Sequence, residues 1–124
     1  MKKGLEEIAL EDGRYSPEAF KFVYEGLGST VSGLKDIYED IDQPHHISGQ
    51  ELCKGLINEA KNKWGLLGRI VLEHWGIKKT RDLGEIVYVM IEHEWMSKQP
   101  EDSIEDFDEV YDLETVFEKD FKLQ

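Results

Sequence analysis

The sequence has one cysteine, no long apolar run, and far fewer basic than acidic residues. A single cysteine excludes an intrachain disulfide and fits a reducing compartment. No stretch approaches the roughly 20 apolar residues that a membrane-spanning helix needs. The N-terminal residues MKKGLEEIALEDG have a basic start, but Glu6 and Glu7 interrupt any apolar run, so we expect no signal peptide. These features predict a cytoplasmic protein that does not enter a membrane.

Sequence signatures of cofactor and metal binding are missing as well. The glycine-rich segment GLGSTVSG, residues 26–33, has neither the GxGxxG spacing of a dinucleotide site nor the Lys-Ser/Thr of a phosphate-binding loop. The sequence contains no HExxH and no paired CxxC for zinc, and the carboxylates of residues 105–114 do not match the DxDxDG pattern of a calcium loop. We therefore expect no cofactor and no metal.

The composition is that of a folded domain. Hydrophobic residues make up 40% and aromatic residues 10% of the 124 residues, which suffices for a core without a disulfide or a metal. We expect a single domain, residues 1–124, with its core at about 16–96 and an acidic C-terminal flank at 97–124.

Helix signals mark the first part of the chain. A short helix at about 4–11 would end at the turn Asp12-Gly13. Ser16 suits an N-cap and Pro17 suits a first helical position, and apolar residues follow at helical spacing to residue 34. Glycines in this second helix either break it near Gly28 or let another helix approach closely. The polar stretch that follows, to residue 46, is a loop or adds one more helical turn.

The clearest signals lie between Ser48 and Met96. Ser48 and Glu51 match a capping box, which opens a helix that Gly65 would end or bend. A following helix at 66–75 would point a set of apolar residues toward the core: Leu66, Leu67, Ile70, Val71 and Trp75. Gly76 is placed to end that helix.

A further helix is predicted at 80–95. Thr80 would be its N-cap, and Asp82 would favour the helix dipole in the first turn. Together, residues 66–95 form a helix-turn-helix-like hairpin. After Met96 the chain becomes acidic, with a loop at 97–103, a short helix at about 113–119, and a possible brief extended segment at 95–98 or 107–111. The overall expectation is a mainly α, compact helical array with little or no β structure.

Charge is distributed unevenly along the chain, whose formal net charge is −12. Residues 97–124 carry ten acidic and three basic residues. Residues 54–81 have only two acidic residues and seven basic ones, which form a possible binding face: Lys54, Lys61, Lys63, Arg69, Lys78, Lys79 and Arg81. Three interpretations are compatible with this contrast. Both stretches are ordinary solvated faces, the acidic segment covers the basic face, or the two stretches bind different partners.

Cysteine and histidine offer the remaining chemistry. Cys53 follows the capping box on the apolar side of its helix, where a small buried residue is expected, although a pairing with His45 or His46 would make it a nucleophile. His74 and His93 lie near the ends of different helices. Surface positions are the expected role of all four histidines, and metal binding is the alternative.

Three blocks, HISGQELCKGL, LEHWGIKKTRDLGEIVY and SKQPEDSIEDFDEVYDLETVF, resemble the Minf_1886 family of small bacterial proteins. The similarity runs from about Tyr15 to Phe117. Leu83 stands where the family pattern has an aromatic residue, and Lys54 where it has an acid. The family has no assigned activity, so the resemblance implies a compact bacterial protein and transfers no catalytic residue.

Three functions are compatible with the sequence. We favour a non-enzymatic protein-interaction module with an unidentified protein partner. In this module the acidic segment either packs on the core or docks on a basic partner through its aromatic residues Phe107, Tyr111, Phe117 and Phe121. The alternative is a nucleic-acid-associated regulator that uses residues 66–95, which the net charge disfavours. An enzyme that uses Cys53 and histidine is the weakest hypothesis.

Overall fold

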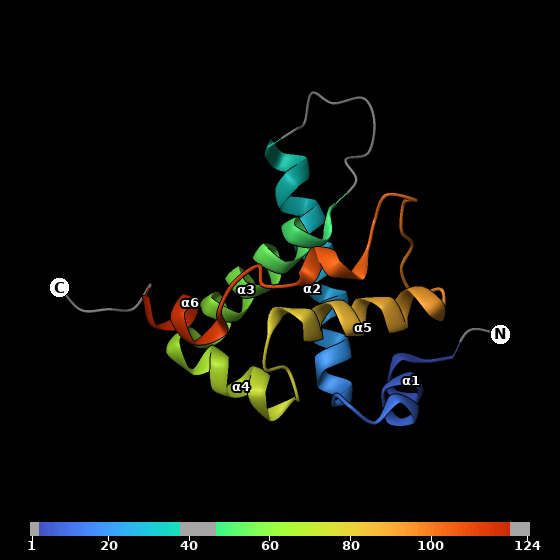
Figure 1. Cartoon of the computed structure of the whole chain (residues 1–124), viewed down its shortest axis with the longest axis horizontal. Coiled ribbons are helices and arrows are strands. Elements are labelled where there is room, and N and C mark those ends of the chain that lie inside the picture. Colours follow the sequence, from blue (N-terminus) through green and yellow to red (C-terminus); the bar gives the residue numbers. More distant parts are fainter. Residues whose placement is uncertain (1–2, 38–46, 120–124) are drawn as a thin grey trace.

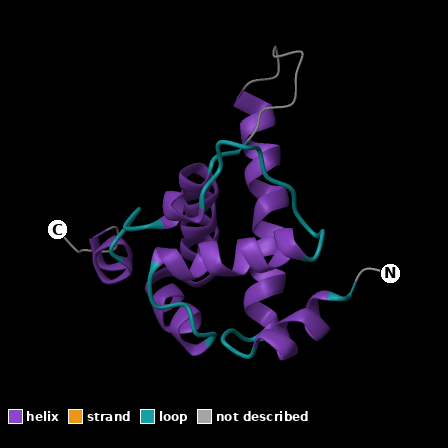
Figure 2. Ribbon diagram, turned by 45° about the vertical axis from the view of Figure 1, so that its right-hand side comes forward, coloured by secondary structure: helices purple, strands orange, loops and turns teal. Residues whose placement is uncertain are grey.

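The protein is mainly α, as the sequence predicts. The computed structural model describes residues 3–37 and 47–119, which contain helices and no strand (Figures 1 and 2). The elements follow in the order α1 Leu5–Asp12, α2 Pro17–Ile37, α3 Gly49–Trp64, the 3-10 helix η1 Gly65–Leu67, α4 Gly68–His74, α5 Thr80–Glu92, the 3-10 helix η2 Ile104–Phe107, and α6 Leu113–Lys119.

The long helix α2 is the axis of the array. Helix α5 crosses α2, α3 packs along α2, and α1 lies at one end of it (Figure 1). Helix α6 lies at the opposite side of the molecule, against α4 and η1. The short η2 turn sits over α5 and also contacts α3, so residues of the acidic segment are part of the array.

A glycine allows α2 and α3 to pack closely. Helix α2 runs without a break to Ile37, past Gly28. A Cβ added to Gly26 would lie 2.2 Å from Leu56 Cδ2 on α3. Of the two roles predicted for the glycines of α2, close helix approach is therefore the correct one for Gly26.

The predicted caps around α3 and α4 are confirmed. The Glu51 N–H donates to Ser48 Oγ at 3.1 Å, and the Ser48 N–H donates to Glu51 Oε1 at 3.0 Å. Gly76 has a left-handed φ of 97° after α4, and the next N–H, of Ile77, donates to Leu72 O at 2.8 Å. The motif places Ile77 fully inside the core.

Two predicted caps are wrong in their side-chain chemistry. The buried Ser16 hydroxyl has no hydrogen-bond partner within the part of the chain that the structure describes, whereas the Ser16 backbone N–H donates to Trp75 O at 3.1 Å. Thr80 is the first residue of α5 and not its cap. The Asp82 carboxylate instead accepts from the N–H groups of Lys78 and Lys79, at 2.8 and 3.1 Å.

The hydrophobic core extends beyond the predicted limits of 16–96. Before that range, Ile8 and Ala9 of α1 are buried. After it, Phe107, Leu113 and Phe117 are each less than 5% exposed and join the same cluster. The largest fully buried side chains come from all parts of the described chain: Ile8, Phe20, Val23, Leu56, Ile57, Leu72, Ile77, Leu83, Ile86, Met90 and Phe117.

Candidate functional site

The predicted basic face is partly neutralised by neighbouring carboxylates. The side chains of Lys54, Lys63, Lys78 and Lys79 are exposed, and those of Lys61, Arg69 and Arg81 are half-buried. Three of the seven form ion pairs within their own helices, each with a glutamate four residues away: Lys63 with Glu59 at 3.9 Å, Arg69 with Glu73 at 3.3 Å, and Arg81 with Glu85 at 3.2 Å. Exposed pairs of this kind stabilise a helix by only about 0.3–0.5 kcal/mol.

The acidic segment lies beside the basic residues Lys79 and Arg81 at the start of α5. Arg81 also pairs with Asp108 of this segment, at 3.0 Å. Lys79 and Arg81 line one groove together with carboxylates of the acidic segment, namely those of Asp108, Glu109 and Asp112. A polyanion approaching this end of α5 would therefore meet negative charge as well as positive charge.

The aromatic residues of the acidic segment are mostly structural. Phe107 is 2% exposed and Phe117 1%, so they pack back onto the core and are not available to a partner. Tyr111 is half-buried and lines the groove at α5, and Phe121 lies outside the described residues. Thr80 of α5 holds this segment in place through two hydrogen bonds. Its buried hydroxyl donates to Phe107 O at 2.6 Å and accepts from the Val110 N–H at 3.2 Å. Sequence reasoning missed this role, since only the fold brings Thr80 to Phe107.

Cys53 is a core residue, as its position on the apolar side of α3 predicts. The side chain is fully buried, and burial raises the pKa of the thiol to about 12. A nucleophilic cysteine needs the opposite, a lowered pKa and partial exposure. His45 and His46, the partners considered for it, lie outside the described residues.

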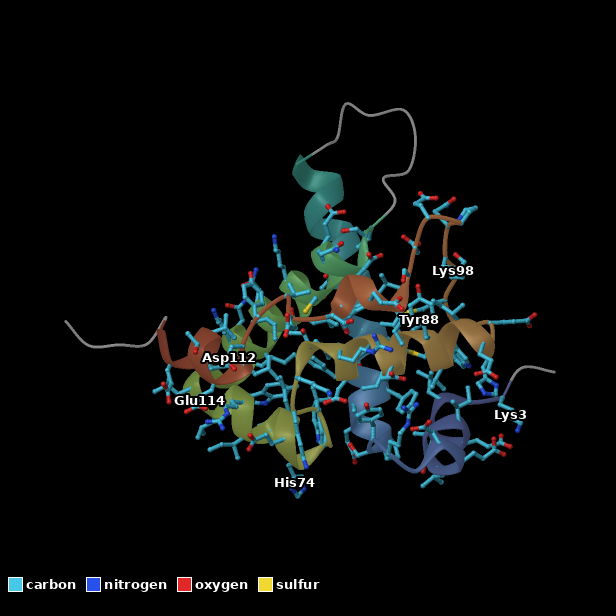
Figure 3. The ribbon with its side chains drawn as sticks, viewed as in Figure 1. Lys3, His74, Tyr88, Lys98, Asp112 and Glu114 are labelled. Carbon is cyan, nitrogen blue, oxygen red and sulfur yellow. The ribbon has the colours of Figure 1, made fainter. Side chains whose placement is uncertain are left out.

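His74 and His93 occupy surface positions near helix ends. Figure 3 shows His74 at the end of α4, pointing away from the molecule, and His93 directly follows α5 with a half-buried side chain. Within residues 3–37 and 47–119, no group of three or more histidine, cysteine or acidic side chains is placed to hold a metal ion. None of the described helices combines the length and apolarity that a membrane crossing requires.

The prediction for the helix at 66–75 is wrong for three of the five residues expected to face the core, and it is right for Trp75, which packs half-buried against the core. Leu66, Leu67 and Ile70 are 53%, 62% and 61% exposed. The core instead takes the opposite side of α4, where Gly68 and Leu72 are buried. Apolar residues occupy nearly every position here, so helical periodicity could not identify the inward side.

Leu66 and Leu67 end the 3-10 helix η1, and Ile70 lies in the first turn of α4; we call these three exposed side chains the α4 surface. Leu66 and Ile70 are four residues apart and Leu67 and Ile70 three, spacings that bring side chains together on a helix. The basic residue Arg69 directly precedes Ile70, and from residue 60 to residue 72 the sequence has three basic residues and no acidic residue. Large apolar side chains exposed as a group are typical of interaction sites.

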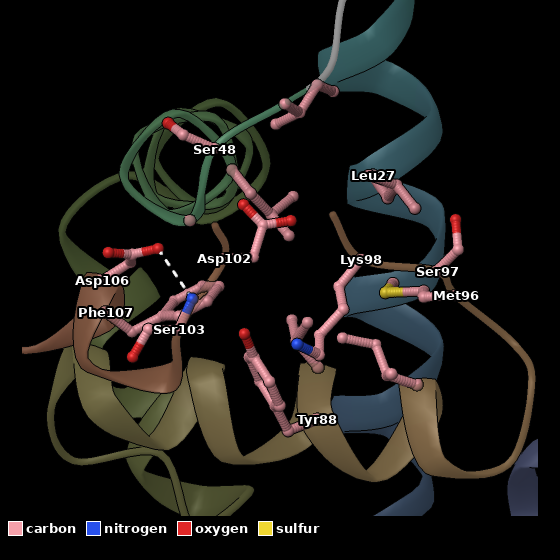
Figure 4. A pocket seen from close by; sticks show the side chains of 15 residues that line it. Leu27, Ser48, Tyr88, Met96, Ser97, Lys98, Asp102, Ser103, Asp106 and Phe107 are labelled. Atoms are coloured by element: carbon pink, nitrogen blue, oxygen red, sulfur yellow. Dashed lines mark hydrogen bonds between the residues drawn. The ribbon is translucent and has the colours of Figure 1, made fainter. Parts of the chain in front are cut away.

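A separate pocket lies between α2, α3, α5 and the loop before η2, and we call it the α5 pocket (Figure 4). Its volume is about 220 Å³. Leu27, Leu52, Val87 and Ile91 supply apolar walls, and Tyr88, Lys98, Asp102, Ser103 and Asp106 supply polar groups. No sequence motif indicates this pocket, since its residues come from four segments.

Comparison of the chain with protein-family models, curated proteins and solved structures gives no match. Function therefore has to be inferred from the residues and the geometry of the chain itself.

Proposed function

We propose that this protein is a non-enzymatic interaction module that docks a protein partner on the α4 surface. The observation that carries the proposal is the joint exposure of Leu66, Leu67 and Ile70. Burying such a side chain contributes about 1.5–3 kcal/mol, so covering three that are more than half exposed would contribute roughly 3–5 kcal/mol before the cost of association.

The charge around the α4 surface favours an acidic partner. From Ala60 to Leu72 the sequence has three basic residues and no acidic residue, and the glutamates that pair with Lys63 and Arg69, namely Glu59 and Glu73, lie just outside this range. A fitting partner is an amphipathic helix with apolar residues three and four positions apart and carboxylates beside them. The acidic aromatic segment of this chain is less suited to a docking role, because Phe107 and Phe117 are already buried.

Neither alternative function gains support from a specific contact. For a nucleic-acid regulator, Lys79 and Arg81 lie beside Asp108, Glu109 and Asp112. For an enzyme, burial keeps the Cys53 thiol protonated and inaccessible. Membership of the Minf_1886 family and a bacterial cytoplasmic location remain proposals that rest on sequence.

A site-specific cross-linker tests the docking surface. A photoreactive amino acid at position 67 should cross-link one defined protein in the source cell, and the cross-link should disappear when Ile70→Glu is added. The matched control places the cross-linker at Leu10, which is 67% exposed on α1 and lies in a groove with Glu73 and His74 but with none of the three residues of the α4 surface. Equal cross-linking from positions 10 and 67 would contradict the proposal. It would also be contradicted if the cross-linker at position 67 captured only lipid or only a second copy of this chain.

A purified system tests the partner chemistry. An acidic amphipathic peptide should bind with an affinity that falls as salt rises, and Ile70→Glu should abolish binding while Leu10→Glu should not. Both variants should melt at the temperature of the parent protein, because the replaced side chains are exposed. Binding of a basic peptide of the same apolar pattern, with no binding of the acidic one, would refute the charge argument alone.

A further inference from the structure

Gly65 separates α3 from the residues of the α4 surface. Its N–H donates to Lys61 O and so closes the last turn of α3, but its own backbone has φ 57° and ψ −135°. These angles are far from helical values, so α3 ends at Trp64. Figure 1 shows that α4 leaves the direction of α3 at this point.

The break decides on which side of the chain Leu67 lies. Leu56 and Ala60, on the buried side of α3, are both completely buried. In an unbroken helix Leu67 would share that side, because residues seven or eleven positions apart point within about 20° of each other. Leu67 is instead 62% exposed and belongs to the α4 surface. The turn at Gly65 therefore moves Leu67 from the core side to the exposed side.

Glycine is the residue that adopts this turn readily. At positive φ the Cβ of an L-residue comes too close to the backbone, and glycine has no Cβ. The pair of angles at Gly65 is close to the mirror image of the polyproline II conformation, which L-residues adopt with ease. A D-residue would therefore fit at position 65 without strain, whereas an L-residue would not.

We infer that Gly65 is a positioning residue for partner docking, which it supports by turning Leu67 outward. This role rests on the proposed function, the docking of a partner helix on the α4 surface. Gly65 acts through Leu67 and needs no contact with the partner.

The chirality of residue 65 tests this role. Gly65→Ala should return the backbone toward helical angles and withdraw Leu67, so the affinity for the acidic amphipathic peptide should fall by about tenfold or more. D-alanine introduced at position 65 by chemical ligation should bind the peptide as tightly as the parent protein does. Both variants add the same methyl group, so a difference between them reports the backbone conformation.

Gly13→Ala is the matched control for strain. Gly13 follows α1 with φ 76°, and a Cβ added there would meet no atom within 4 Å. Like Leu10, it lines a groove that includes none of the three residues of the α4 surface. Gly13→Ala should lower the melting temperature and leave the affinity for the peptide unchanged.

A second measurement needs no partner. In NMR spectra a soluble paramagnetic agent broadens the methyl signals of exposed side chains. The Leu67 signals should broaden strongly in the parent protein and with D-alanine at position 65, and much less in Gly65→Ala. Leu72, which is 1% exposed, is the internal reference for a buried leucine.

The outcomes separate this role from the docking function itself. A parent protein that binds no peptide would refute both. If the parent protein binds, this role alone is refuted by equal affinity in Gly65→Ala, by equal broadening of Leu67 in that variant, or by weak binding with D-alanine. The D-alanine protein decides the matter even where Gly65→Ala does not fold, because it has to melt and bind like the parent protein.

Discussion

Replacement of Phe107 by alanine is the most direct test of the role of the acidic segment. The Phe107 ring is 2% exposed and packs between two glycines, Gly49 at the start of α3 and Gly84 in α5. A Cβ on Gly49 would lie 2.9 Å from the ring, and one on Gly84 would lie 2.7 Å from it. With such close packing on both sides, neighbouring groups cannot easily fill the space that the ring leaves.

The expected loss follows from the size of the deleted group. Truncation of a buried phenylalanine to alanine lowers the free energy of unfolding by about 3–5 kcal/mol. We expect about 4 kcal/mol for Phe107→Ala, which corresponds to a fall in melting temperature on the order of 15 °C for a chain of this length. Phe107→Leu keeps most of the apolar volume and should lose much less.

Urea denaturation followed by tryptophan fluorescence measures this difference, because the chain has three tryptophans. The transition midpoint should fall in Phe107→Ala with little change in the dependence of the free energy on urea. An unchanged midpoint would show that the segment from Ile104 to Phe117 is a removable flank. The assignment of these residues to the core would then be wrong.

Thr80→Val should destabilise the protein by about 2–3 kcal/mol, because Phe107 O and the Val110 N–H lose their partner, while Thr80→Ser keeps both hydrogen bonds and should lose only about 1 kcal/mol; thermal melts that rank serine below valine would contradict this. The Cys53 thiol, with its pKa raised to about 12 by burial, should not react with a thiol reagent at pH 8 until urea unfolds the chain; rapid labelling of the folded protein would show an accessible thiol. The free energy of unfolding should fall above about pH 9 by at most about 1.4 kcal/mol per pH unit, because the unfolded chain loses the Cys53 proton at a lower pH than the folded chain does. Denaturation measured from pH 8 to 11 should show a smaller decrease in Cys53→Ala. Burial and the Asp82 carboxylate raise the pKa of Tyr15, so Tyr15→Phe should reduce the further loss above about pH 10, and an identical pH profile would refute that assignment.

The fold class and several helix ends could be predicted because their causes are local. The Ser48–Glu51 capping box and the Gly76 turn each depend on residues within a few positions of one another. Those contacts form wherever the chain is placed, so the sequence alone reveals them.

Contacts between distant segments were not predictable in this way. Thr80 resembles an N-cap, but its hydroxyl is taken by Phe107, 27 residues away. Ser16 suits a cap equally well, but the contact of its backbone with Trp75 sets its position. Each prediction used the local preference of the residue, and the tertiary contact overrode it.

The candidate surfaces show the same limit. In the stretch from Leu66 to Leu72 apolar residues occur on every side, so the pattern could not show that Ile70 is exposed and Leu72 buried. The basic residues were recognised, but the pair of Arg81 with Asp108 was not predictable, because Asp108 reaches Arg81 only through the folding back of the acidic segment. The α5 pocket depends on four segments and has no signature in any of them.

The position of Phe107 between Gly49 and Gly84 has a consequence for synthesis of the chain. The ribosome adds about 5–20 residues per second, so Phe107 follows Met96 into the growing chain by about half a second to two seconds. During that interval the glycine-lined gap between α3 and α5 is complete in sequence but has no ring to fill it. The nascent protein therefore passes through a state with an open apolar gap, which a chaperone can recognise and which closes when Phe107 arrives.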